Sequence, residues 1–216
     1  MKPERIKREE SAQAGTLAAG ASELPALARR AVEAFVSEGK IIERPPVPGG
    51  ILDQRAACFV SLKTYAGELR GCIGTIQPTR ATLAEELIAN AVSAATRDPR
   101  FPPVETEELQ DLRYSVDVLH EPEAAEFEEL DPKNYGVIVE DPSGVYRGLL
   151  LPDLQGVETA RQQVDIAARK AGIPPGTQLR LWRFRVERFR EPVQKAATAV
   201  NLNQQNEENK ENIDDR

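Results

Sequence analysis

The sequence contains two cysteines, and one of them lies in a short segment whose residue types favour close contact with another molecule. That segment is Leu69-Arg70-Gly71-Cys72-Ile73-Gly74. A cysteine thiolate is a nucleophile and a ligand for soft metals. Gly71 and Gly74 remove side-chain bulk near Cys72, which lets a ligand or another chain approach the backbone. Cys72 is therefore the first candidate for a chemical role, with both glycines as candidate substrate- or partner-binding positions.

The segment is expected to be the second strand of a hairpin whose first strand covers residues 57–65. A connection with an even number of residues keeps the apolar side chains on one face, whereas an odd number buries Arg70 or Lys63 beside them. We therefore expect the even register. It pairs Val60 with Ile73, Ser61 with Cys72, Leu62 with Gly71, and Lys63 with Arg70. It assigns Cys58, Val60, Leu62, Leu69 and Ile73 to the core, and Phe59, Ser61, Lys63, Arg70, Cys72 and Gly74 to the other face.

This register predicts the surroundings of the thiol. Lys63 and Arg70 become neighbours of Cys72 on one face, and their positive potential favours the thiolate. Cys72 is then a candidate nucleophile, Arg70 and Lys63 are candidates to stabilise negative charge, and Ser61 is a candidate binding residue. The structural alternative stays open: free cysteine is often buried, and glycine in a strand can make room for a packed helix.

Several kinds of site have little or no support in the sequence. His120 is the only histidine, and a Cys–His dyad requires the fold to bring the end of its strand beside Cys72. Two cysteines and one histidine, without a CxxC or HxxxH motif, do not provide the ligands of a zinc site. No glycine-rich nucleotide-binding motif is present. The sequence therefore indicates no metal site and no particular cofactor.

A second group of interest is Asp98-Pro99-Arg100-Phe101-Pro102-Pro103. The proline steps predict a rigid loop. Arg100 can present a planar fork to a carboxylate or phosphate, which makes Asp98 and Arg100 candidate binding residues. The alternative is an internal Asp98–Arg100 pair that anchors the loop, with Phe101 in the core.

The elements that position these residues can be predicted from periodicity. Three amphipathic helices are expected: one over residues 24–35 between Ser22 and Gly39, one after Thr82, and one after Thr159. Strands are expected at residues 57–65, 69–76, 114–119, 136–140, 145–151 and 179–190. Several hairpin signals favour a largely antiparallel sheet with helices packed on it, which is an α+β fold.

Composition limits the class of protein. The chain has 216 residues and a net charge of −7, which argues against a surface built for nucleic-acid backbone. Five arginines within residues 179–190 are a local exception, for which a solvated strand face is the simpler interpretation. No apolar run is long enough to span a membrane, and residues 1–22 lack the apolar core of a secretory signal. We expect a cytoplasmic domain over residues 22–192, with disordered segments at 1–21 and 193–216.

The motifs resemble the AMMECR family. Residues 69–74 match its LRGCIG signature, and further blocks follow in the family's order. These blocks are residues 57–63, 98–102, 114–122, 149–152 and 169–172. Residues 151–154 and the chain length resemble the prokaryotic members, called AmmeMemoRadiSam system protein A, which are encoded with a Memo-type protein and a radical-SAM enzyme. The resemblance implies a larger and a smaller subdomain with the signature lining a cleft between them. It implies no particular reaction.

The sequence supports three hypotheses of function. In the first, the protein is an enzyme or enzyme component that uses Cys72 as a nucleophile, with Asp98 and Arg100 shaping the cleft. In the second, it is a non-catalytic adaptor that docks a Memo-type or radical-SAM partner through the glycine-flanked strand. A third hypothesis, binding of nucleic acid through residues 180–190, has less support because of the negative net charge.

Overall fold

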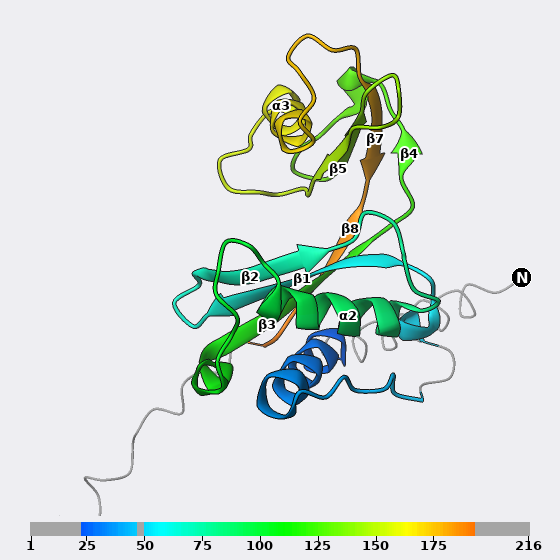
Figure 1. Ribbon diagram of the computed structural model, residues 1–216. Coiled ribbons are helices and arrows are strands. Elements are labelled where there is room, and N and C mark those ends of the chain that lie inside the picture. The colour runs from blue at the N-terminus through cyan, green and yellow to red at the C-terminus, as the bar shows by residue number, and fades with distance from the viewer. Residues whose placement is uncertain (1–22, 47–49, 193–216) are drawn as a thin grey trace, which may run out of the picture.

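The computed structural model of the protein describes residues 23–46 and 50–192, and these residues form a larger and a smaller lobe (Figure 1). The segments expected to be disordered, residues 1–21 and 193–216, lie outside the described residues, as does Ser22.

The larger lobe is built on a four-stranded antiparallel sheet with the strand order β2-β1-β3-β8. Its strands are β1 (Ala57–Thr64), β2 (Leu69–Gly74), β3 (Leu112–Leu119) and β8 (Val186–Arg190). Apolar residues alternate along β1 and β3, so that Val60, Leu62 and Val116 point to one face and are fully buried. The other face of the sheet is turned toward the smaller lobe (Figure 1).

Two helices cover the apolar face of this sheet: residues 23–38 and α2 (Leu83–Thr96) (Figure 1). α2 begins as predicted, because Thr82 Oγ1 accepts a hydrogen bond from the backbone N–H of Glu85. The N-terminal helix ends before Gly39, whose φ of 68° is the left-handed conformation that favours glycine. Both helices bury leucine and alanine against the sheet: Leu24, Leu27, Ala28, Ala31, Leu83, Leu87, Ala91 and Ala94.

The smaller lobe contains a second antiparallel sheet, in the order β4-β7-β5-β6. Its strands are β4 (Glu123–Ala124), β5 (Gly136–Glu140), β6 (Arg147–Leu150) and β7 (Arg180–Phe184). One helix, α3 (Ala160–Lys170), packs on β5 and β6 and begins with the predicted Thr159–Gln162 capping box. Short 3₁₀ helices lie at Ile51–Asp53, Thr106–Asp111 and Phe127–Glu129.

The prediction of one strand over residues 179–190 is wrong. The chain leaves the smaller sheet after β7, passes Arg185, and enters the larger sheet as β8, so that one extended stretch serves both lobes. Two segments connect the lobes, one after β3 and one between β7 and β8. They are bonded to each other, because the backbone N–H of His120 donates to the Arg185 carbonyl at 3.0 Å. An apolar cluster at this junction consists of Ala57, Leu119, Ile138, Leu149 and Phe184.

The α+β class and the antiparallel pairing predicted from the sequence are confirmed, although the strands are divided between two sheets. Within the described ranges, no helix has the length and apolar character that crossing a membrane would require.

Candidate functional site

The register of the β1–β2 hairpin is the one predicted from the sequence over most of its length. Val60 lies opposite Ile73, Ser61 opposite Cys72, and Leu62 opposite Gly71. The pairing then shifts by one residue, so that Lys63 lies opposite Leu69 instead of Arg70. The predicted Lys63–Arg70 pair is therefore wrong, and so is the core position of Leu69, which is 37% exposed. An irregularity of this kind re-aims the side chains beyond it.

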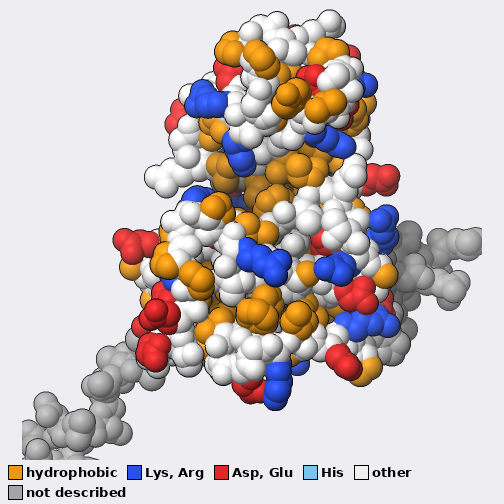
Figure 2. All heavy atoms as spheres, viewed as in Figure 1, with side chains coloured by type: hydrophobic (Ala, Val, Ile, Leu, Met, Phe, Trp, Pro, Cys, Tyr) orange, Lys and Arg blue, Asp and Glu red, His pale blue; other side chains and the backbone are white. Residues whose placement is uncertain are grey.

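The polar face of the larger sheet carries the candidate residues. We call this the open face and define it by nine residues: Phe59, Ser61, Lys63, Cys72, Arg113, Ser115, Asp117, Arg188 and Arg190. Cross-strand pairing places them in rows. Cys72, Ser61, Ser115 and Arg190 form one row, and Phe59, Asp117 and Arg188 form the next row toward the smaller lobe. Figure 2 shows a hollowed waist between the lobes, with hydrophobic side chains in it.

Cys72 is partly exposed on this face, whereas Cys58 is buried in the core. The Ser61 hydroxyl donates a hydrogen bond to Cys72 Sγ at 3.2 Å. Burial raises the pKa of the Cys72 thiol, and the charges of Asp117 and Asp98 act in the same direction. The Ser61 hydrogen bond and the charge of Arg100 oppose this rise without cancelling it. The thiol is therefore protonated at neutral pH.

The cations expected beside the thiol are not the ones found there. Arg70 Nε and Nη2 donate to the Glu108 carboxylate at 2.6 and 2.8 Å, and its other hydrogen bonds go to the carbonyls of Pro102 and Pro103. The cation that acts on the Cys72 thiol is instead Arg100, whose Nη2 also donates to the Cys72 carbonyl oxygen at 3.4 Å; Arg188 lies in the neighbouring row of the sheet. The prediction that Lys63 and Arg70 favour the thiolate is therefore wrong.

Each of the two arginines near Cys72 has an aspartate of its own. Arg188 Nε and Nη2 bind the two oxygens of Asp117 at 2.7 and 2.9 Å, and Asp117 is buried. Arg100 Nε and Nη2 bind Asp98 at 2.9 and 2.6 Å. Because each positive charge is matched, the surroundings of the thiol are polar but close to neutral.

Asp98 holds the edge of the hairpin in place. Its buried carboxylate accepts hydrogen bonds from the backbone N–H groups of Cys72 at 2.8 Å and Arg100 at 3.1 Å, in addition to the Arg100 guanidinium. These bonds, with the guanidinium contributing most, hold the pKa of the Asp98 carboxyl far below its usual range. The internal Asp98–Arg100 pair foreseen as an alternative is confirmed. Phe101, however, is only partly buried and lies under the guanidinium groups of Arg100 and Arg70.

The two glycines of the signature make room for the protein's own atoms. A Cβ at Gly71 would lie 2.2 Å from the Ala94 carbonyl oxygen of α2, and a Cβ at Gly74 would lie 2.2 Å from the Phe59 ring. Glycine is thus required at both positions by close internal packing. This agrees with the structural alternative and leaves neither glycine as an approach point for another chain.

His120 does not form a dyad with Cys72. It follows β3 at the junction of the lobes, where Nε2 is 4.0 Å from the Glu187 carboxylate and the side chain is 57% exposed. It borders a cavity of about 500 Å³ that is also lined by Arg55, Arg147 and Trp182. In the described parts of the chain, no cluster of three or more His, Cys, Asp or Glu side chains could hold a metal ion.

Sequence reasoning did not place five residues of the open face beside Cys72: Arg113, Ser115, Asp117, Arg188 and Arg190. Ser115 and Asp117 alternate with apolar residues in β3, and that alternation was the available signal. Their position beside Cys72 depends on the pairing of β1 with β3 and of β3 with β8, which connects segments far apart in the sequence.

Comparison with known proteins gives consistent results. Residues 25–192 match the AMMECR1 family. A protein of Thermotoga maritima is 49% identical over 164 residues, which cover 74% of this chain and 93% of that protein. Protein MJ0810 of Methanocaldococcus jannaschii is 38% identical over 76% of this chain and 86% of its own length. The crystal structure of the uncharacterised protein PH0010 from Pyrococcus horikoshii has a TM-score of 0.71 and 34% identity, covering 77% of this chain and 89% of that one.

Proposed function

The chain belongs to the AMMECR1 family, and we propose that it is the ligand-binding component of an AmmeMemoRadiSam-type system, alongside a Memo-type protein and a radical-SAM enzyme. Its proposed site is the open face around Cys72. The proposed ligand is a small molecule that one of these partners makes or consumes. The observation that carries the proposal is a partly exposed thiol, bonded by the Ser61 hydroxyl at 3.2 Å, with Arg100 bound to the Cys72 carbonyl oxygen at 3.4 Å and Arg188 in the neighbouring row.

Polar groups of different kinds meet at this position. Ser61 supplies a hydroxyl, Cys72 a thiol, and Arg100 and Arg188 supply guanidinium groups whose Nη1 atoms make no hydrogen bond to any described residue. The Phe59 ring adds an apolar surface toward the lobe junction. A few polar groups beside an apolar surface are typical of small-molecule sites.

The geometry supports binding better than attack by a cysteine nucleophile. A nucleophilic cysteine needs a lowered pKa or an adjacent base, whereas the pKa of Cys72 is raised. The carboxylates that influence the thiol, Asp98 and Asp117, are each bound by an arginine, and the described partner of the thiol is the Ser61 hydroxyl and not a carboxylate. Cys72 is therefore proposed to contact the ligand as a neutral thiol.

Docking of a partner through the glycine-flanked strand is the less supported function. Gly71 and Gly74 are packed against Ala94 and Phe59, and the outer edge of β2 at Cys72 is occupied by Asp98 and Arg100. A strand edge whose backbone groups already have partners offers little to an added strand.

The proposal is tested by protection of Cys72 from alkylation. Small-molecule filtrates are prepared from cells that express the Memo-type and radical-SAM proteins and from cells that lack the radical-SAM gene. The full chain is treated with iodoacetamide in each filtrate, and labelling of Cys72 is followed by mass spectrometry. The complete system should slow the labelling at least several-fold, and native mass spectrometry should detect the retained compound.

Arg30→Gln and Arg100→Gln serve as the matched control and test variants. Arg30 is an exposed residue of the N-terminal helix on the opposite side of the sheet, so its variant should retain protection, whereas Arg100→Gln should lose it. Equal labelling rates in both filtrates, with no retained mass, would remove the proposal.

A further inference from the structure

We propose that the outer end of the open face is a phosphate-binding subsite formed by Lys63, Arg113, Arg190 and Ser115. The inference deepens the proposed function and rests on it, because the subsite lies on the same face as Cys72. The ligand of the site is then a phosphate-bearing small molecule whose remaining part extends toward the thiol.

The first observation is a pair of like charges directly opposite each other. Lys63 of β1 and Arg113 of β3 are cross-strand partners, so their Cβ atoms lie about 5 Å apart on one face. Like charges in this relation destabilise a sheet. Arg190 adds a third cation diagonally, since it lies opposite Ser115, two residues along β3 from Arg113. An unfavourable arrangement of this kind is offset when an anion binds between the cations.

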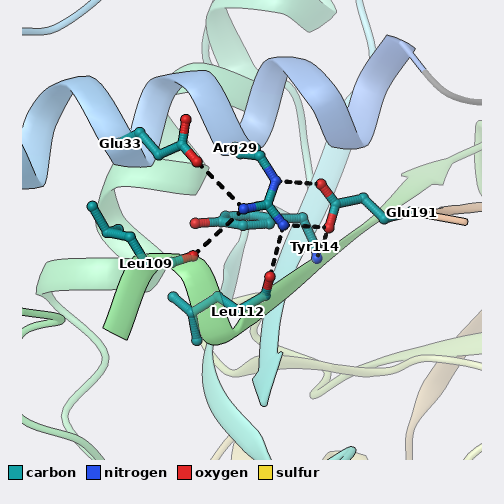
Figure 3. A network of polar contacts seen from close by, with 6 residues as sticks. All are labelled: Arg29, Glu33, Leu109, Leu112, Tyr114 and Glu191. Carbon is teal, nitrogen blue, oxygen red and sulfur yellow. Dashed lines mark hydrogen bonds and ion pairs between the residues drawn. The ribbon is translucent and has the colours of Figure 1, made fainter. Parts of the chain in front are cut away.

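The second observation is that Glu191, a carboxylate beside these cations, is already engaged by another arginine. Glu191 follows Arg190, and its two oxygens accept hydrogen bonds from Arg29 Nε at 2.6 Å and Nη2 at 2.8 Å (Figure 3). One of these oxygens also accepts the backbone N–H of Tyr114 at 3.0 Å. The charge of Glu191 is therefore matched by Arg29 of the N-terminal helix.

The three cations lack the ion-pair partners within the described residues that many arginines of the chain have. Among the described residues, Lys63, Arg113 and Arg190 form no ion pair and no side-chain hydrogen bond; Arg113 only stacks on the Tyr65 ring at 5.6 Å. By contrast, eight arginines form salt bridges with carboxylates: Arg29, Arg44, Arg70, Arg100, Arg147, Arg180, Arg183 and Arg188. In a chain of net charge −7, the three cations stand out as a local positive site.

The third observation is a cavity of about 230 Å³ at the same place. Its lining includes Lys63, Arg113, Ser115 and Arg190, together with Thr64 and Gly67 of the hairpin end. The side chains of Arg113 and Arg190 can each bind oxygen atoms in a planar fork, and Ser115 can donate a hydroxyl hydrogen bond. A doubly charged tetrahedral phosphate matches three cations on three strands better than a single carboxylate does.

The subsite and the thiol are within reach of one ligand. Ser115 lies opposite both Ser61 and Arg190, and Ser61 lies opposite Cys72. Two strand spacings therefore separate Ser115 from Cys72, which is roughly 10 Å. A phosphate held at Arg113 and Arg190 places the rest of a small metabolite over Ser61 and Cys72.

The test uses the full chain and inorganic phosphate as the probe. Binding is measured by calorimetry, and the melting temperature is followed in rising phosphate with chloride added to keep the ionic strength constant. Phosphate should bind the wild type and raise its melting temperature. Arg113→Gln should weaken phosphate binding at least about tenfold, because a charge-assisted hydrogen bond is lost. Without phosphate, the melting temperature of Arg113→Gln should equal or exceed that of the wild type, because the like-charge pair is removed.

Two further variants make the result specific. Arg30→Gln removes an exposed cation from the other side of the sheet and should bind phosphate like the wild type, which controls for the general stabilising effect of phosphate. Cys72→Ser should also keep phosphate binding. Equal phosphate affinities for Arg113→Gln and Arg30→Gln would overturn the inference, as would tight binding of a single-stranded oligonucleotide that phosphate does not displace. If phosphate binds as expected but the filtrate of the complete system does not protect Cys72 from alkylation, the result counts against the ligand site around the thiol and not against the phosphate subsite.

Discussion

Replacing Asp98 with asparagine tests whether this buried carboxylate anchors the segment that carries Cys72. In Asp98→Asn, the acceptor for the Cys72 and Arg100 backbone N–H groups and for the Arg100 guanidinium loses its charge. The new amide also brings N–H donors to a place where the surrounding groups are donors. Because Asp98 is only 4% exposed, solvent cannot replace the bond to the Cys72 backbone N–H, whereas the Arg100 side chain is 54% exposed and can be hydrated.

The expected cost is about 3 kcal/mol, since hydrogen bonds to charged groups contribute about 1.5–3 kcal/mol each and the pair with the half-exposed Arg100 adds less than about 1 kcal/mol. For a folded domain of this size, the melting temperature should fall by about 6–12 °C. The assay is urea unfolding of both proteins at pH 7, followed by circular dichroism.

The loss of stability caused by Asp98→Asn must also become smaller as the pH falls. The pKa of Asp98 is depressed in the folded state, so its contribution to stability is complete above the unfolded pKa of about 3.9 and declines as pH falls below it. The difference between wild type and Asp98→Asn should therefore shrink by about 1.3 kcal/mol between pH 7 and pH 3. A difference below about 0.5 kcal/mol at pH 7, or one that does not shrink in acid, would refute the reasoning.

Two further substitutions test the packing of the same lobe. Gly71→Ala should destabilise the protein by about 1–3 kcal/mol, because the new Cβ would lie 2.2 Å from the Ala94 carbonyl oxygen; urea unfolding with no measurable loss would contradict the close contact with α2. Arg29→Ala should cost about 2–4 kcal/mol, because Glu191, with a side chain 16% exposed, loses its partner and the Leu112 carbonyl loses a donor. The exposed Arg44–Asp53 pair gives the comparison: Arg44→Ala should cost less than about 1 kcal/mol, and equal losses would show that burial does not set the magnitude.

Local patterns predicted much of the fold. The cap residues Thr82 and Thr159 and the terminator Gly39 determine where helices begin and end, and each acts within a few residues. The hairpin register could be predicted because moving Val60 and Leu62 to the other face would expose them. The shift between Leu62 and Lys63 could not, since a strand irregularity leaves no clear trace in the alternation of residues.

The surroundings of Cys72 were harder to predict because they depend on contacts between distant segments. Arg188 reaches the open face only because β8 pairs with β3, and Arg70 turns to Glu108 after the irregularity. Sequence spacing indicated the Asp98–Arg100 pair as one alternative, but it could not assign Glu108 to Arg70 or Asp117 to Arg188. Burial of Cys72, together with the charges of Asp117 and Asp98, is what changes the expected thiolate into a thiol, and Arg70, bound to Glu108, does not oppose it.

The central claim is that Cys72 opens onto a ligand-binding face as a neutral thiol, and comparative alkylation of the two cysteines tests it most directly. The native protein is treated with iodoacetamide over a range of pH, and labelling at each position is resolved by peptide mass spectrometry. Cys72 should be labelled slowly at neutral pH, with a rate that rises without a plateau below about pH 9. Cys58, whose pKa burial raises to about 12, should be labelled only when the protein unfolds. Fast labelling of Cys72 that is already constant near neutral pH, or equal protection of both cysteines, would contradict the claim.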